Sequence, residues 1–122
     1  MAAVASVVSI ILFLAFLTAG IQKVLFSPAM SHAAEHLGLT KRLYRRIGVV
    51  EMVAGVAVMV GLVGKGASFL AILNEVAAAG LVALMIGAVI VHRRRSDALA
   101  AYGPALGLGV LALIEVVTRL FQ

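Results

Sequence analysis

The chain contains no cysteine and few charged residues. None of its 122 residues is cysteine, and 12% are charged. The absence of cysteine excludes disulfide bonds, thiolate metal sites and dithiol redox chemistry. It therefore excludes the mechanism of small membrane enzymes that work through cysteine pairs, such as the vitamin K epoxide reductases. The shortage of charge argues against a soluble domain, because a surface of this size in water needs more polar groups.

Apolar sequence makes up most of the chain. Hydrophobic residues account for 64% of it, and the mean hydropathy is +1.19. Four runs carry little or no charge: residues 2–22, 47–64, 66–91 and 98–118. Each run is long enough to cross roughly 30 Å of hydrocarbon as a helix.

The sequence therefore predicts an all-α membrane protein, a bundle of four transmembrane helices in one domain over residues 1–122. The helices are expected at about 2–24, 44–64, 66–92 and 99–121. The first run lacks a basic start and is longer than the apolar core of a signal peptide, so we expect an uncleaved first helix.

The basic residues predict the orientation of this bundle. Eight of the ten lie between the first and second helices or between the third and fourth: Lys23, Lys41, Arg42, Arg45, Arg46, Arg93, Arg94 and Arg95. Lys65 and Arg119 fall on the opposite side. Because positively charged loops stay in the cytoplasm, both termini are expected outside it. Topology and contact with anionic headgroups then account for the net charge of +5, and no nucleic-acid partner is expected.

A short polar segment between the first two helices contains a metal-like motif. Residues 32–36 read His-Ala-Ala-Glu-His, which matches the zinc signature of one class of peptidases. A Ser-Pro start and a following glycine predict a short helix over 28–37, lying at the membrane interface. His32 and His36 share one face of it, but a zinc peptidase needs a third ligand and an open cleft. The two histidines are therefore only weak candidates, and no metal is expected.

Polar residues inside the predicted membrane helices are the stronger functional candidates. A central acidic residue costs roughly 2.5–3.5 kcal/mol to insert into a bilayer. Glu51, Glu75 and Glu115 occupy three different helices, and Asn74 adjoins Glu75. We expect each carboxylate to face the bundle. Arg119, one turn after Glu115, is its expected partner.

The faces of the predicted helices suggest how these residues meet. Glu75 belongs to a row of small residues at i+4 spacing, Ala71, Ala79, Ala83 and Gly87, which is typical of close packing between membrane helices. Glu75 is therefore expected to face another helix. Four residues near the cytoplasmic side are predicted to form one inner cluster: Lys23, Arg45, Glu51 and His92. This cluster is either a structural set of ion pairs and snorkelling side chains or a ligand or proton site.

Short motifs at the ends of the helices carry a family resemblance. "TAGIQK" at 18–23 ends the first helix, "RRIGVVE" at 45–51 opens the second, and "AVIVH" at 88–92 closes the third. In this order and spacing the chain resembles the DoxX-like family of small four-helix bacterial membrane proteins. The resemblance implies a bundle in the bacterial inner membrane. The matching positions in this sequence are Lys23, Gly48, Glu51 and His92.

The resemblance leaves three functions open. Some members resemble the small membrane subunit of a thiosulfate:quinone oxidoreductase, which implies a non-catalytic subunit or accessory protein that binds a quinone or another lipophile between its helices. An assembly factor that stabilises partner membrane proteins is the first alternative. A proton-coupled transporter is the second, although the small multidrug resistance proteins carry their essential Glu on a first helix, where this chain has no acid. The expected partners are the bilayer, other membrane proteins or further copies of the chain, and no catalytic residue is predicted.

Overall fold

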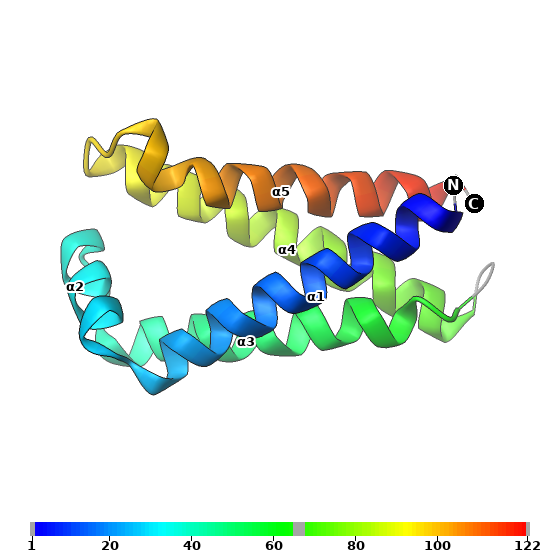
Figure 1. Ribbon diagram of the computed structural model, residues 1–122, viewed down its shortest axis with the longest axis horizontal. Coiled ribbons are helices and arrows are strands. Elements are labelled where there is room, and N and C mark those ends of the chain that lie inside the picture. The colour runs from blue at the N-terminus through cyan, green and yellow to red at the C-terminus, as the bar shows by residue number, and fades with distance from the viewer. Residues whose placement is uncertain (1, 65–67, 122) are drawn as a thin grey trace.

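The computed structural model describes residues 2–64 and 68–121, and the regular structure of these residues is helical. The helices are α1 (Ala2–Leu25), α2 (Pro28–Leu37), α3 (Lys41–Gly61), α4 (Phe69–Arg94) and α5 (Leu99–Leu120). The four long helices run back and forth along one axis, and α2 lies across one end of them (Figure 1). The start of α1 and the end of α5 lie together at the other end. All eight basic residues assigned to the cytoplasmic side belong to the end with α2, whereas Lys65 lies outside the described residues.

Side-chain caps explain where α2, α3 and α4 begin, and a glycine explains where α2 ends. Ser27 accepts a hydrogen bond from the amide three residues ahead, and Gly38 ends α2 in the left-handed conformation, as the sequence predicted. Thr40 accepts a hydrogen bond from the amide of Leu43 at 3.1 Å, so α3 begins at position 41 and includes Lys41 and Arg42, which the predicted start at about position 44 had left outside. Ser68 caps α4 in the same way. The predicted start of that helix at position 66 lies outside the described residues.

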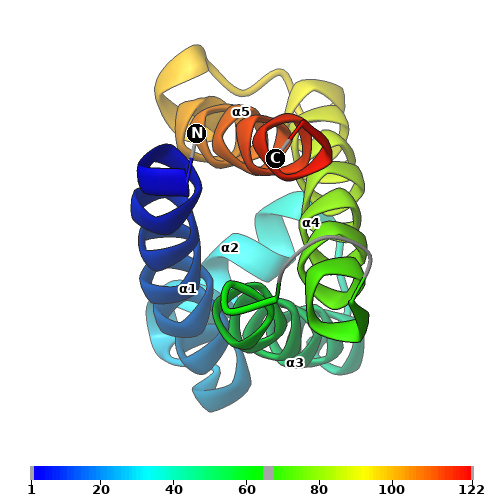
Figure 2. The ribbon, with the colours of Figure 1, turned by 90° about the vertical axis from the view of Figure 1, so that its right-hand side faces the viewer.

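The long helices form a closed ring around one core. In cyclic order α1 packs on α3, α3 on α4, α4 on α5, and α5 on α1 (Figure 2). All four contribute to the central apolar cluster, which comprises Val8, Leu12, Phe16, Val58, Ala78, Leu81, Met85 and Ala112. Helices α1 and α3 cross closely, and a Cβ added to Gly20 would lie 2.5 Å from the carbonyl oxygen of Gly48. This crossing therefore requires glycine, as in other closely packed membrane helices.

Three helices of the described chain are long and apolar enough to cross a membrane. They span Ala3–Leu25, Phe69–Arg94 and Leu99–Leu120. The fourth expected span, α3, does not qualify by length and composition. Its first two turns carry four cations and Glu51 follows, so the apolar stretch recognised in the sequence is only part of a longer, more charged helix.

The buried face of α4 differs from the predicted one. Its buried residues are Ala71, Asn74, Ala78, Leu81 and Met85. Glu75 is half-buried beside this stripe, whereas Ala79 and Ala83 are exposed. Ala71 at the start of the predicted row is buried, and Gly87 at its end is half-buried and lines a cavity, so the row through Glu75 turns toward the other helices only in part. Small and apolar residues occur on every side of α4, so their spacing does not distinguish the inner face.

Candidate functional site

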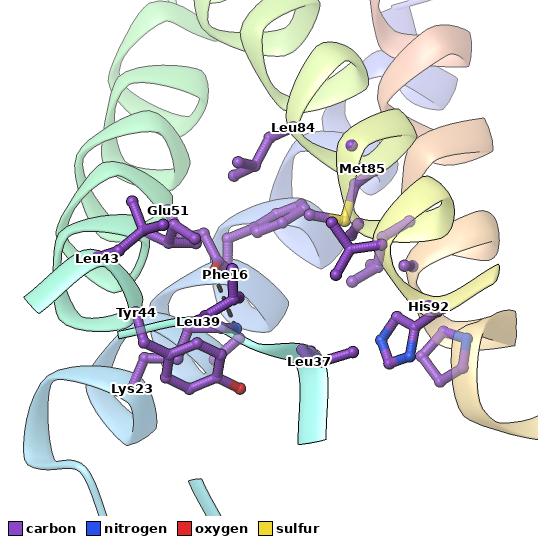
Figure 3. Close-up of a pocket in the computed structure, with 18 of the residues that line it drawn as sticks. Phe16, Lys23, Leu37, Leu39, Leu43, Tyr44, Glu51, Leu84, Met85 and His92 are labelled. Carbon is purple, nitrogen blue, oxygen red and sulfur yellow. Dashed lines mark ion pairs between the residues drawn. The ribbon is translucent and has the colours of Figure 1, made fainter. Parts of the chain in front are cut away.

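A cavity of about 530 Å³ lies among the long helices at the end covered by α2. Four of its lining residues carry polar side chains: Lys23, Tyr44, Glu51 and His92. Lys23, Tyr44 and His92 lie toward the end where Leu37 lines the cavity, and Leu84 and Met85 lie at the opposite end (Figure 3). The volume and the mainly apolar walls match those of small-molecule sites in proteins.

An ion pair between α1 and α3 forms part of the cavity wall. Nζ of Lys23 lies 2.8 Å from Oε1 of Glu51, whose side chain is almost fully buried. The close crossing at Gly20 and Gly48, one turn from each partner, brings the two helices near enough for this contact. Because the pair neutralises the buried carboxylate, Glu51 is tolerated in the core. The ammonium has three donors, so two remain for other acceptors around it.

Tyr44 belongs to the same site although the sequence analysis did not select it. Its ring centroid lies 5.5 Å from Nζ of Lys23, a distance typical of a cation–π contact. Its hydroxyl donates to the sulfur of Met30 at 3.7 Å, which connects α3 to α2. Tyr44 precedes Gly48 and Glu51 by four and seven residues, so helical spacing on that face is the signal that indicates it.

A carboxylate outside the helices joins two imidazoles near the cavity. Asp97 accepts at Oδ1 from Nε2 of His36 at 2.6 Å, and at Oδ2 from Nδ1 of His92 at 2.7 Å. These two hydrogen bonds, that from His92 first, hold the pKa of Asp97 below its usual range. We call this group the His–Asp–His bridge. It ties α2 to the turn between α4 and α5, and it leaves Nε2 of His92, a cavity residue, for other partners.

Two residues of the expected polar sets lie elsewhere. Arg45 is exposed and lines a separate groove, so the predicted inner cluster contains Lys23, Glu51 and His92 without it. His32 is exposed on α2, whereas His36 contacts Asp97. Within residues 2–64 and 68–121, no group of three potential ligands could hold a metal ion.

The remaining candidates lie toward the other end of the bundle. Glu115 accepts a hydrogen bond from Ser9 at 2.5 Å, which joins α5 to α1. Arg119 donates to the carbonyl oxygens of Gly61 at 3.1 Å and Gly64 at 2.8 Å. These contacts do not test the expected Glu115–Arg119 pair, which stays a prediction. The guanidinium of Arg119 thus donates to carbonyl groups at the end of α3, beyond which no further helical turn supplies donors.

Asn74 and Glu75 are neighbours with different surroundings. Asn74 is fully buried, and its Nδ2 donates to the carbonyl oxygen of Val58 at 2.8 Å, which connects α4 to α3. Glu75 forms no hydrogen bond or ion pair with another described residue. Asn74, Glu115 and Arg119 thus hold the helices together away from the cavity.

Comparison with known families gives the membership of the chain. The model of the DoxX-like family matches residues 7–115, which is most of the sequence. The chain belongs to the DoxX-like family. No curated protein and no solved structure matches it. Family membership and the apolar helices together make this DoxX-like chain a membrane protein in contact with the lipid bilayer.

The sequence positions that carried the DoxX-like resemblance meet around the cavity. Lys23, Glu51 and His92 line it, and Gly48 lies at the helix crossing beside the ion pair. Three segments that are distant in this DoxX-like sequence therefore contribute to one polar end of an apolar chamber. Such a chamber can hold an elongated apolar molecule with one polar group.

Proposed function

We propose that this DoxX-like protein is a small membrane subunit or accessory protein that binds a quinone or another lipophile in the cavity. In this role it serves a membrane oxidoreductase or another membrane complex. One observation carries the proposal: the Lys23–Glu51 ion pair and His92 line the same cavity, whose other walls are mainly apolar.

The chemistry of the cavity suits a quinone. A quinone has an apolar body and carbonyl acceptors, so Lys23 can donate to one carbonyl oxygen. Nε2 of His92 can donate to a carbonyl when the ring is protonated, and can accept from a quinol hydroxyl when it is neutral. Because Nδ1 of His92 is held by Asp97, the ring has a fixed orientation toward the ligand.

We further propose that α3 crosses the membrane together with the other long helices. It runs antiparallel between α1 and α4 along the length of the bundle (Figure 1). Its 21 residues measure about 31 Å at the helical rise, close to the thickness of the hydrocarbon core. Four crossings place both termini outside the cytoplasm of a bacterial inner membrane, with the basic end inside.

Filling the cavity tests the ligand proposal. A Cβ added at Gly87, which lines the cavity, or at Gly80, on the same helix outside it, meets no atom within 4 Å. Gly87→Phe should therefore occupy the ligand space, and Gly80→Phe is its matched control. The three proteins are purified from native membranes in mild detergent, and their quinones are extracted and quantified by mass spectrometry.

We expect quinone at a fixed ratio to the wild-type protein and to Gly80→Phe, and its loss from Gly87→Phe. Thermal unfolding of the ligand-free proteins checks that both variants fold. Quinone contents that are equal in all three proteins and follow the total lipid would refute the proposal.

An assembly role is the second candidate, favoured by Glu75. This carboxylate is half-buried on α4, lacks a described partner and lies one turn from the exposed Ala79. A partner helix or a second copy of the chain could satisfy it. Glu75→Gln should then reduce co-purification of the partner or the share of oligomer, whereas Glu35→Gln on the exposed face of α2 should not. Unchanged assembly in both variants would exclude this role for Glu75.

A further inference from the structure

Four cations line a groove beside the end of α1. The groove has a volume of about 510 Å³ and is lined by Val24, Lys41, Arg42, Arg45, Arg46 and Val49. It shares none of these residues with the cavity described above. Among the residues that the structure describes, no carboxylate lies within ion-pair distance of the four cations. The groove therefore concentrates positive charge that the chain itself does not neutralise.

The charged groove continues into an apolar stripe on the same face of α3. Arg42, Arg46 and Val49 follow one another at helical spacing, and the stripe goes on through three exposed residues: Val53, Val56 and Val60. Val24 lies at the end of the apolar span of α1. The groove thus lies at the level where hydrocarbon gives way to headgroups, and the valines extend from it toward the bilayer centre.

We propose that this groove is a binding site for an anionic phospholipid. The phosphate lies among the guanidinium groups of Arg42, Arg45 and Arg46, and the acyl chains lie along the valines of α3. Guanidinium groups pair with phosphate oxygens through two parallel hydrogen bonds, which a lysine ammonium cannot do. Lys41, whose ammonium lies 5.3 Å from the ring centroid of Phe26, adds positive charge at the rim.

A lipid fits the site better than a free phosphate ion. An inorganic anion would neutralise the arginines but would leave the adjoining stripe of valines without a role. A phospholipid presents a negative headgroup and an apolar tail in the same order as the groove and the stripe. Basic pockets at the ends of membrane helices bind such lipids by this combination.

The test compares two arginine pairs on the same end of the protein. Arg45→Gln/Arg46→Gln removes two groove cations, and Arg93→Gln/Arg94→Gln removes two cations that are also exposed but lie outside the groove. Each protein is placed in phosphatidylcholine nanodiscs containing a minor fraction of phosphatidylglycerol, and native mass spectrometry then counts the phosphatidylglycerol retained on release. We expect one retained lipid in the wild type and the control, and about a tenfold loss in the groove variant, since each basic group adds severalfold to anionic-lipid affinity.

A charge-preserving variant separates a shaped site from general attraction to the membrane. Arg45→Lys/Arg46→Lys keeps the charge that insertion requires but removes the paired hydrogen bonds, so it should also retain less lipid than the wild type. This Lys variant tests the lipid site even if the Arg45→Gln/Arg46→Gln variant fails to insert into the membrane. Equal retention in the wild type and the Lys variant, or equal losses in both Gln pairs, would overturn the proposal.

Inorganic phosphate provides the last arm of the test. Added at millimolar concentration to the detergent-solubilised complex, it should leave the retained phosphatidylglycerol in place because it lacks the acyl chains. Displacement of the lipid by phosphate, with phosphate bound in its stead, would assign the groove to a free anion and overturn the lipid proposal.

Discussion

The ammonium of Lys23 lies 2.8 Å from the carboxylate of Glu51, and the helices that carry them touch through Gly20 and Gly48. The ion pair and the glycine crossing depend on each other. Without the close crossing the side chains would be held farther apart, and without the pair a buried carboxylate would face the crossing unneutralised. The polar end of the cavity is built on this arrangement.

A double-mutant cycle should detect the coupling between Lys23 and Glu51. Each single change to Ala leaves one charge unpaired in a low-dielectric setting and should cost roughly 3–5 kcal/mol of stability. The double change should cost clearly less than the sum of the two. Thermal unfolding in detergent measures all four corners of the cycle, and additive losses would show that the two side chains do not interact.

The glycine crossing can be tested with a single methyl group. Gly20→Ala would place its Cβ against a backbone carbonyl oxygen of α3, so the helices must separate. We expect a loss of about 1–3 kcal/mol, as for other overpacked cores. Gly80→Ala adds the same methyl group where no atom lies within 4 Å and should not destabilise the protein. Equal stability of the two variants would contradict a glycine-dependent crossing.

Local signals in the sequence predict several elements well. A capping serine, a proline and a glycine define α2, because each acts through its immediate neighbours. Lys23 and Glu51 are conspicuous because a charged residue next to or within an apolar run needs a partner. Helical spacing from Gly48 then indicates the face on which Glu51 lies.

Contacts between residues that are far apart in the sequence could not be predicted from such local signals. Asp97 and His36 are separated by 61 positions in the sequence, and no motif near either residue predicts their hydrogen bond. On α4, several sets of small residues share helical spacing, so the row through Glu75 was selected although the most buried face passes through Asn74 and Ala78. Lys41 and Arg42 were left out of the predicted helix because hydropathy and capping give different starts for α3.

The pH dependence of stability should reveal the His–Asp–His bridge. Asp97 has its pKa held below the ordinary value of 3.8 by hydrogen bonds from His92 and His36. A carboxylate with a lowered folded pKa contributes stability that is complete above its unfolded pKa and is lost as the pH falls through the folded one. Asp97→Asn should therefore lower the thermal midpoint at neutral pH. Its difference from the wild type should disappear in acid, and a difference that did not change with pH would argue against this origin.

The two histidines of α2 should behave differently. His36→Gln removes one hydrogen bond of the bridge and should increase hydrogen exchange in α2, with a stability loss of no more than about 1 kcal/mol because the side chain is largely exposed. His32→Gln, one turn away, should change neither property. Elemental analysis should find no stoichiometric zinc in either variant or in the parent. Zinc in the parent that is lost with His36 would instead make this segment a metal site.

Reporter fusions should decide how many times the chain crosses the membrane. Three crossings would place the termini on opposite sides, whereas a fourth by α3 returns both to one side. Because basic residues gather at the end with α2, we expect both termini outside the cytoplasm and a reporter between residues 93 and 97 inside it.

A reporter inserted at Val63, just after α3, should be extracytoplasmic. Each position is fused in turn to a reporter that is active only outside the cytoplasm and to one that is active only inside it. A misfolded fusion is then recognised because neither reporter is active. A cytoplasmic signal at Val63 would remove α3 from the membrane-spanning set and, with it, the proposed four-helix topology.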